Sequence, residues 1–407
     1  MRNKYLKGIS ANILLLGTVS LLNDLSSEMI MPILPMFVRA LGGAGLAIGL
    51  VGGFRDSISS ILKVFCGYWS DRTGKRKIFV SSGYLISSLF KLFLAFSKTC
   101  QYAVIFAALE RVGKGLRTAA RDAIIAESMA AERGKGFGIH RALDTSGAIL
   151  GSIVVFLLFW FFGFGFKLII LIAGVIAFAS LIPLRFVKED KRKPQKITLK
   201  VGLKNLPKSL KLFVLISAVF ALGNFSYMFF IIRAQQFFTA KLSIAIPILL
   251  YVLFNIFYAA FAVPLGVLSD KIGRKKIIIL GYLLFSLTSF GFAYLTSLPA
   301  FIVLFALYGI TCATVDGNQR AYVSDLSSQQ LKATALGTFH TTIGLMALPA
   351  SLIAGFLWQN IAPNTTFIYG GILGFISVLL FIAFRRYFVV PKGPNEQGAL
   401  VRQKLKR

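Results

Sequence analysis

Apolar stretches of about 20 residues recur along the whole sequence, separated by short polar or charged connections. A helix of that length crosses the ~30 Å hydrocarbon core of a bilayer and satisfies its backbone hydrogen bonds internally. The composition agrees, because 56% of the residues are hydrophobic, against roughly 45 to 50% in soluble domains. A β-barrel would instead show alternating segments of about 10 residues. The chain is therefore predicted to be an all-α membrane protein.

The apolar runs and their polar breaks predict twelve membrane-spanning helices. The predicted spans are 9–38, 45–69, 77–97, 102–126, 136–160, 164–186, 211–237, 244–268, 276–296, 299–322, 334–357 and 365–389. The first run follows Lys4 and Lys7, but it is too long for a signal peptide and has no small-residue cleavage site. It is therefore expected to remain as the first helix.

The connection between the sixth and seventh spans is polar, basic and interrupted by Pro194 and Pro207. Such a composition is typical of a linker. The predicted organisation is an N-terminal six-helix bundle (1–186), a basic cytoplasmic linker (187–210), a C-terminal six-helix bundle (211–389) and a basic cytoplasmic tail (390–407).

Lys and Arg residues gather on alternate connections, and they give the chain a formal net charge of +30. These connections are the N-terminus (Arg2, Lys4, Lys7), the segment 72–77, Arg133 with Lys135, the linker, the segment 271–276 and the tail 402–407. Because basic loops stay in the cytoplasm, we expect a multi-pass protein of the cell inner (plasma) membrane with both termini cytoplasmic. We attribute the positive charge to the orientation of the loops in the membrane and to contact with the anionic headgroups of the lipid bilayer. The Lys and Arg residues do not gather on one amphipathic face, so the sequence does not predict nucleic-acid binding.

One loop sequence occurs twice, about half the chain apart. The segment GYWSDRTGKRK, which begins at Gly67, returns as GVLSDKIGRKK, which begins at Gly266. Each copy follows the second span of its half, and Gly83-Tyr84 is echoed by Gly281-Tyr282. Internal duplication of this kind is how many transporter folds are built.

The repeated segment resembles the G-x-x-x-D-R-x-G-R/K-R/K-R/K loop between helices 2 and 3 of the major facilitator superfamily (MFS). The segment from Arg111 to Gly115 is similar to the R-x-x-Q-G motif of proton-coupled drug antiporters in that superfamily, with Lys114 in place of the usual Gln. The segments 23–29 and 113–122 look like a bacterial permease subgroup of unsettled substrate. The resemblance covers essentially the whole chain, and it implies two pseudo-symmetric six-helix bundles with a cavity lined by helices 1, 4, 7 and 10.

In similar proteins the repeated loop latches one conformation. Here that implies a conformational latch made of Gly67, Asp71, Arg72, Gly74, Arg76, Asp122, Asp270 and Arg274. Glycines permit a tight turn, an Asp is stabilised at a helix N-terminus, and an Arg can pair with an acidic helix end. We expect Asp71 to face the start of helix 11, and Arg72 or Arg76 to face Asp122 or Glu127. The alternative is that these residues only fix topology and cap helices.

Two carboxylates of the first span are candidates for proton coupling. A charge at mid-membrane costs at least ~2.5 to 3.5 kcal/mol on insertion scales, so it is a functional hypothesis by default. Asp24 and Glu28 are i, i+4 on one helix face, where each hinders the ionisation of the other. Arg111 is the predicted partner whose field holds one of them ionised until substrate binding or rearrangement removes it.

Other polar residues of the spans are candidates for contact with a small-molecule substrate. In the first half these are Arg55, Asp56, Lys114 and Arg117, and in the second half Asn224, Tyr227, Arg233, Gln236, Asn255, Tyr258 and Asp316. This distribution indicates protonation in the first half and much of the substrate surface in the second. The alternative for the first half is static ion pairs, Arg55 with Asp56 and Glu110 with Lys114.

The predicted function is secondary active transport of a small solute by alternating access, with proton-coupled export (antiport) as the leading hypothesis. Proton-coupled uptake of an anionic solute is one alternative, and a transporter-like sensor or lipid-handling protein is another. The sequence has no phosphate-binding Gly-rich loop, no zinc spacing and no nucleophile elbow, so no enzymatic activity, cofactor or metal is expected. The expected partners are a small solute, protons and lipid, and the protein is expected to be a monomer.

Overall fold

The computed structural model describes residues 9–129, 132–189, 206–327 and 331–388. Within these ranges the regular elements are helices. The first half contains α1 (Ala11–Ile30), α2 (Leu34–Ala40), α3 (Gly45–Thr73), α4 (Arg76–Ala95), α5 (Cys100–Ser128), α6 (Arg133–Trp160), α7 (Phe166–Ala179) and α8 (Leu181–Arg185). The second half contains α9 (Lys208–Gly223), α10 (Met228–Gln235), α11 (Leu242–Ile272), α12 (Arg274–Tyr294), α13 (Leu298–Asp325), α14 (Lys332–Asn360), α15 (Pro363–Ala383) and the short 3₁₀ helix η2 (Arg385–Tyr387).

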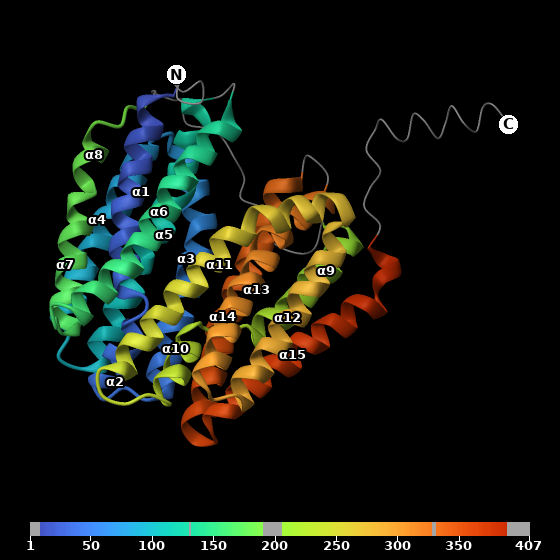
Figure 1. Ribbon diagram of the computed structural model, residues 1–407. Coiled ribbons are helices and arrows are strands. Elements are labelled where there is room, and N and C mark those ends of the chain that lie inside the picture. Colours follow the sequence, from blue (N-terminus) through green and yellow to red (C-terminus); the bar gives the residue numbers. More distant parts are fainter. Residues whose placement is uncertain (1–8, 130–131, 190–205, 328–330, 389–407) are drawn as a thin grey trace, which may run out of the picture.

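The helices form two bundles, one from each half of the sequence (Figure 1). The bundles pack against each other through α3 with α14 and through α6 with α11. Three pairs of short helices, α1 with α2, α7 with α8 and α9 with α10, each make one span, which is consistent with the predicted twelve. Eleven spans of the described residues are long and apolar enough to cross a membrane, and α5 falls short because it carries a run of charged residues. The predicted all-α fold with two six-helix bundles is confirmed.

Three of the predicted spans are not single helices, and the span 164–186 is divided into α7 and α8 at Ser180. The span 9–38 is interrupted at residues 31–33, because Pro32 has no backbone N–H to continue the ladder. The span 211–237 is interrupted at residues 224–227, where the N–H of Ser226 bonds the hydroxyl of Ser351 on α14 at 3.2 Å. The sequence analysis predicted these spans as unbroken helices. Pro32 was a local signal for the first break, whereas the segment 224–227 holds neither Pro nor Gly, although Gly223 precedes it.

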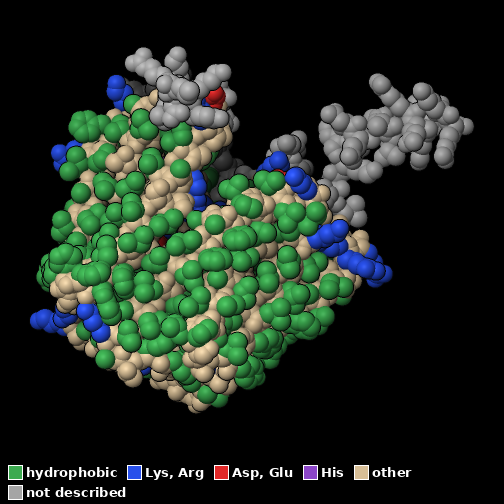
Figure 2. All heavy atoms as spheres, viewed as in Figure 1, with side chains coloured by type: hydrophobic (Ala, Val, Ile, Leu, Met, Phe, Trp, Pro, Cys, Tyr) green, Lys and Arg blue, Asp and Glu red, His purple; other side chains and the backbone are tan. Residues whose placement is uncertain are grey.

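The outward faces of both bundles are covered by apolar side chains, as Figure 2 shows for one side of the molecule. Val175 is 58% exposed, Leu287 57% and Val263 72%. In a bilayer such side chains face lipid tails, so their exposure carries no cost in water. The described surface therefore fits the predicted membrane location.

The two ends of the molecule differ in how closely the two bundles approach each other. We call the end that holds the repeated loops the motif end, and the opposite end the distal end. At the distal end α3 and α14 touch closely, since a Cβ atom on Gly45 would lie 2.6 Å from the carbonyl oxygen of Gly355. At the motif end the bundles diverge, and Figure 2 shows a hollow between them. Most of the predicted linker and the tail 390–407 lie outside the described residues.

Candidate functional site

A cavity of about 390 Å³ lies between the two halves towards the motif end. Its lining from α5 and α6 is Arg121, Asp122, Phe137, His140, Arg141 and Asp144, and its lining from α11 and α13 is Tyr258, Ala262, Ala313, Asp316, Gly317 and Arg320. Both signs of charge therefore face the same space, and both halves contribute to it. Two predicted substrate contacts, Tyr258 and Asp316, are brought together here, because the Tyr258 hydroxyl donates to Asp316 Oδ2 at 3.2 Å.

Polar contacts close the distal end between the halves. The atoms are Arg39 Nη1 with Gln235 Oε1 at 3.1 Å, Leu46 N with Gln359 Oε1 at 3.2 Å, and Lys241 Nζ with Trp160 O at 2.5 Å. The Lys241 ammonium also lies 4.6 Å from the centre of the Trp160 ring. The space between the halves is therefore open towards the motif end and closed by these contacts at the distal end.

Asp24 lies on α1 next to a second carboxyl group. Its side chain is within hydrogen-bonding reach of Asp144 on α6, and Arg141 holds the other side of Asp144 at 3.0 Å. Two carboxyl groups can bond each other only when one of them keeps its proton. Asn23 donates its Nδ2 to Asp24 Oδ1 at 3.4 Å. The sequence could not reveal Asp144 as the neighbour, because it is far along the chain.

Glu28 connects the two halves. The hydroxyl of Tyr251, on α11, donates to Glu28 Oε2 at 2.7 Å. The Tyr251 side chain is 4% exposed, so this bond has little competition from water. A hydrogen bond to an ionised carboxylate is about twice as strong as a neutral one. The protonation state of the Glu28 carboxyl group therefore affects how tightly α1 is held to the second half.

Glu110 is the centre of a buried ion-pair cluster. Its Oε2 lies 3.0 Å from Arg111 Nε and 3.6 Å from Arg55 Nη1, and the three side chains are 4 to 6% exposed. The pairs considered from sequence, Arg55 with Asp56 and Glu110 with Lys114, are not the ones that form. Packing of α3 on α5 directs Arg55 to Glu110, whereas the side chain of Asp56, the next residue on the helix, is exposed. Arg111 therefore contacts Glu110 and not the carboxylates of α1.

Lys114 and Arg117 follow on α5 but face different surroundings. Lys114 lies within electrostatic range of three carboxylates, Asp24, Glu28 and Asp56. Arg117 instead lies 4.3 Å from the centre of the Tyr84 ring and donates to Ser87 within the first bundle. Both side chains lie within electrostatic range of Asp24, and Lys114 also lies within range of Glu28 and Asp56.

The predicted contacts of the second half are divided between the centre and the distal end. Tyr227 reaches across to Met31 of the first half, while the side chain of Asn224 is exposed at the helix break. The Nδ2 of Asn255 is buried and has no hydrogen-bond partner among the described residues. Arg233 and Gln236 lie at the distal end: Arg233 donates to the carbonyl oxygens of Phe292 and Ala293, and Gln236 lines a cavity of about 470 Å³.

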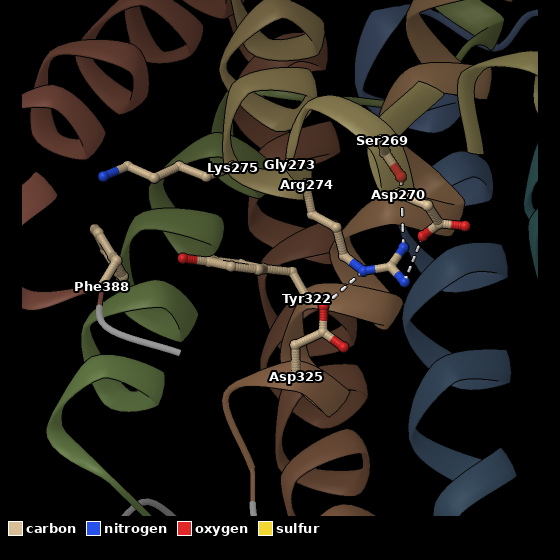
Figure 3. A pocket seen from close by; sticks show the side chains of 8 residues that line it. All are labelled: Ser269, Asp270, Gly273, Arg274, Lys275, Tyr322, Asp325 and Phe388. Atoms are coloured by element: carbon tan, nitrogen blue, oxygen red, sulfur yellow. Dashed lines mark hydrogen bonds and ion pairs between the residues drawn. The ribbon is translucent and has the colours of Figure 1, made fainter. Parts of the chain in front are cut away.

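The repeated loops hold matching ion-pair triads, each within its own half. In the first, Arg76 contacts Glu127 and lies 2.7 Å from Asp71. In the second, Arg274 lies 2.7 Å from Asp270 and 2.6 Å from Asp325, next to a cavity of about 310 Å³. Figure 3 shows the Arg274 guanidinium held between Ser269, Asp270 and Asp325, with Lys275 extending away from it.

The other predicted latch residues have local roles in this conformation. Gly74 and Gly273 have positive φ angles of 68° and 98°, which glycine adopts most easily, where α3 and α11 end. Asp122 pairs with its neighbour Arg121 at 2.9 Å, and Arg72 contacts the Tyr68 hydroxyl at 3.4 Å. A Cβ atom on Gly67 would lie 3.0 Å from Ala119, whereas the equivalent Gly266 has open space around it. An interaction of Asp71 with the start of α14 is not among its contacts in the described residues.

Lys91 is a buried charge that the sequence analysis missed. It is 1% exposed, and its Nζ lies 2.9 to 3.3 Å from four oxygen atoms of Asn23, Ser26 and Ser27 on α1. Its position in the middle of a predicted span was a usable signal, since a charge at membrane depth is costly. Lys91 donates to the side-chain oxygen of Asn23, and the side-chain nitrogen of Asn23 donates in turn to Asp24.

Comparison with known proteins fits this architecture. The sequence profile described as Major Facilitator Superfamily matches residues 16–250 and 213–406. An uncharacterized MFS-type transporter of Methanocaldococcus jannaschii is 60% identical over 92% of this chain and 95% of its own length. The bacillibactin exporter of Bacillus subtilis is 30% identical over 38% of this chain and 40% of its own. The crystal structure of the nucleoside transporter NupG, 18% identical, superposes with a TM-score of 0.75 over 93% of this chain and 99% of that one. The protein belongs to the Major Facilitator Superfamily and is a membrane transporter.

Proposed function

We propose that this transporter couples the movement of a small solute to protons, and that the carboxylates of α1 carry them. The observation behind the proposal is the hydrogen bond from Tyr251 to Glu28, because it joins an ionisable group of one half to the other half. Asp24 with Asp144 supplies a second place for a proton on the same helix face.

The proposed cycle uses protonation to change how firmly the halves are held together. A proton on Glu28 removes the charge from the acceptor of the Tyr251 bond and weakens that bond by roughly 1 kcal/mol. A proton that crosses ~100 mV supplies about 2.3 kcal/mol, which is enough to drive a change of this size. The two halves would then rock about the solute and exchange the open motif end for an open distal end.

The proposed orientation places the motif end in the cytoplasm of the inner membrane. The support is the alternation of basic connections, since the loops 72–77 and 271–276 lie on the side that the positive-inside rule assigns to the cytoplasm. Both termini are then cytoplasmic.

Export by antiport is the proposed direction. Partial similarity to the bacillibactin exporter and the antiporter-like segment at Arg111 support it. Uptake of an anionic solute together with protons is the second candidate, because two guanidinium groups lie buried at the centre. Antiport requires that the solute displaces protons, whereas co-transport requires that it recruits them.

The test is a proton count on the purified protein in weakly buffered detergent solution. Solutes are added one at a time, and release or uptake of protons is followed with a pH indicator. Release supports antiport, and uptake supports co-transport. Loss of the signal in both Asp24→Asn and Glu28→Gln, with solute binding retained, would assign it to these groups. Solute binding with no proton signal in the wild type would remove proton coupling and favour a sensor or lipid-handling role.

A further inference from the structure

Three hydrogen-bond donors converge on the sulfur atom of Met31. Arg55 Nη2 lies 2.7 Å from Met31 Sδ, the Tyr227 hydroxyl 2.8 Å, and Arg111 Nη2 3.4 Å. The Tyr227 hydroxyl also lies 3.3 Å from the carbonyl oxygen of Met31. Arg55 and Arg111 come from α3 and α5 of the first half, and Tyr227 comes from the break between α9 and α10 in the second. The convergence point therefore lies where the two halves meet.

A thioether is a poor match for such donors. Methionine sulfur is a weak acceptor, whereas guanidinium groups form their strongest and most directional bonds with oxyanions. Arg55 is 4% exposed and Arg111 5%, so water does not compensate for the weak acceptor. The donors are arranged for a partner better than the one they have.

The charges at this point also call for an anion. Glu110 is the carboxylate paired with both Arg55 and Arg111, so two positive charges face one negative charge. These three side chains alone have a formal charge of +1 when ionised, and the carboxyl groups of Glu28 and Asp56, which also lie within electrostatic range of Arg55, offset it only when they are ionised. Burying an uncompensated charge is costly, and an anionic ligand would remove that cost.

We propose that Met31 occupies an oxyanion subsite, and that a carboxylate of the transported solute displaces its side chain and binds Arg55, Arg111 and Tyr227. The inference rests on the second candidate of the proposed function, co-transport of an anionic solute with protons, and specifies that solute. Met31 is suited to move, because methionine is flexible and this one begins the interruption between α1 and α2. Tyr227 would make the bound anion a bridge between the halves.

Neighbouring carboxylates set the proton linkage of this subsite. Glu28 and Asp56 lie within electrostatic range of both Arg55 and Tyr227. An anion bound among them is repelled when they are ionised and is favoured when they hold protons. Anion binding and protonation therefore reinforce each other. A carboxylate solute that binds here recruits protons, which is the behaviour of the second candidate, co-transport, and not of antiport.

The test compares small probes that differ only in charge, bound to the full-length protein in detergent. Acetate and acetamide have almost the same size, and methyl phosphate represents the other common oxyanion. Met31→Ala empties the subsite, so acetate should bind it at least about 10-fold more tightly than it binds the wild type, while acetamide should not. Met31→Leu refills the space and is the matched control, with no gain expected. Affinities are read from the rise in melting temperature with probe concentration.

Further variants separate the outcomes. Tyr227→Phe removes one donor, and it should weaken acetate binding by roughly 5- to 10-fold in the wild-type background, even if Met31→Ala cannot be purified. Equal responses to acetate and acetamide in every protein that folds would overturn the proposal. A larger response to methyl phosphate would support the subsite and assign it to phosphate esters.

Failure of the subsite and failure of the proposed function give different results. Probe binding needs no membrane gradient, so charge-specific binding without any proton signal would leave the subsite standing and refute proton coupling. A proton signal that accompanies only neutral or cationic solutes, without any preference for acetate, would support proton coupling and refute the oxyanion subsite.

Discussion

The two halves share a hydrogen-bonded pair but surround it with opposite chemistry. In the first half Ser20 bonds the hydroxyl of Tyr84 at 3.1 Å, and in the second Ser217 bonds Tyr282 at 3.2 Å. Around the first pair lie guanidinium groups, including that of Arg121, which donates to the Ser20 hydroxyl at 3.1 Å. Around the second pair lie aromatic rings and neutral groups.

The aromatic character of the second half is consistent along its core. The ring of Phe220 stacks on Tyr282 with centres 3.9 Å apart, and Phe230 stacks on Tyr308 at 4.3 Å. In the register of the repeat, Tyr308 stands where the first half has Glu110. Stacked rings hold one packing arrangement, whereas ion pairs and carboxyl groups change with charge. The core of the first half thus contains groups whose charge can change, whereas the core of the second half is built from stacked aromatic rings.

The largest expected difference between the halves is at these equivalent positions. Glu110→Gln removes the carboxylate that pairs directly with two buried guanidinium groups and should cost about 3–5 kcal/mol of stability. Tyr308→Phe keeps the stacked ring and should cost about 1 kcal/mol or less. Thermal unfolding in detergent compares the two variants. Equal losses in melting temperature would contradict the contrast between the cores.

The next effect concerns the bond that links the halves. Tyr251→Phe removes the donor to Glu28, and it should lower proton-coupled flux roughly 10-fold, as expected for a charge-assisted bond of about 1.5 kcal/mol. Tyr369→Phe is the matched control, because its hydroxyl donates to the carbonyl oxygen of Leu222 within the second half. Flux in proteoliposomes under a pH gradient distinguishes them. An equal or greater loss in the control would contradict a special role for the bond between Tyr251 and Glu28.

A smaller effect is expected at the repeated loops. Arg76 is 11% exposed and Arg274 25%, so the first triad is better shielded from water. Arg76→Ala should change the accessibility of the cavity from the motif end more than Arg274→Ala does, by a factor of roughly 2 to 5 for a difference of 0.5–1 kcal/mol. Labelling of single cysteines in the cavity measures this. Arg72→Ala is the control; a change as large as that of Arg76→Ala would contradict the assignment of the pairs.

The smallest effect is expected at the distal end. Lys241→Gln removes the cation that lies over Trp160, a contact of about 0.5–1 kcal/mol at an exposed site. The distal end should then open slightly more often, which labelling from that side would detect. Unchanged or reduced labelling would show that this contact does not hold the end closed.

The sequence predicted the fold well because the bilayer imposes a simple rule on it. Span length and hydropathy gave the twelve segments, and the duplicated loop gave the division into halves. The break at residues 224–227 escaped because tertiary contacts, such as that of Ser226 with Ser351, compensate for the lost helical bonds. No local signal in the sequence records such a partner.

The sequence predicted which charged residues lie within the membrane spans. It predicted less well which of these residues contact one another. The spacing of Asp24 and Glu28 fixed their shared face, but the partners Asp144 and Tyr251 come from distant helices whose register depends on packing. Met31 gave no signal at all, since an apolar residue in a span is expected. Only the structure brings it together with Arg55 and Tyr227.

The central claim is that α1 carries the protons that drive transport, and solute flux into proteoliposomes tests it most directly. A solute that changes the proton count of the purified protein is followed with and without a pH gradient. In the wild type the gradient should drive net accumulation. In Asp24→Asn combined with Glu28→Gln it should not, while exchange of solute without a gradient continues. Accumulation that persists in this double variant would contradict the account.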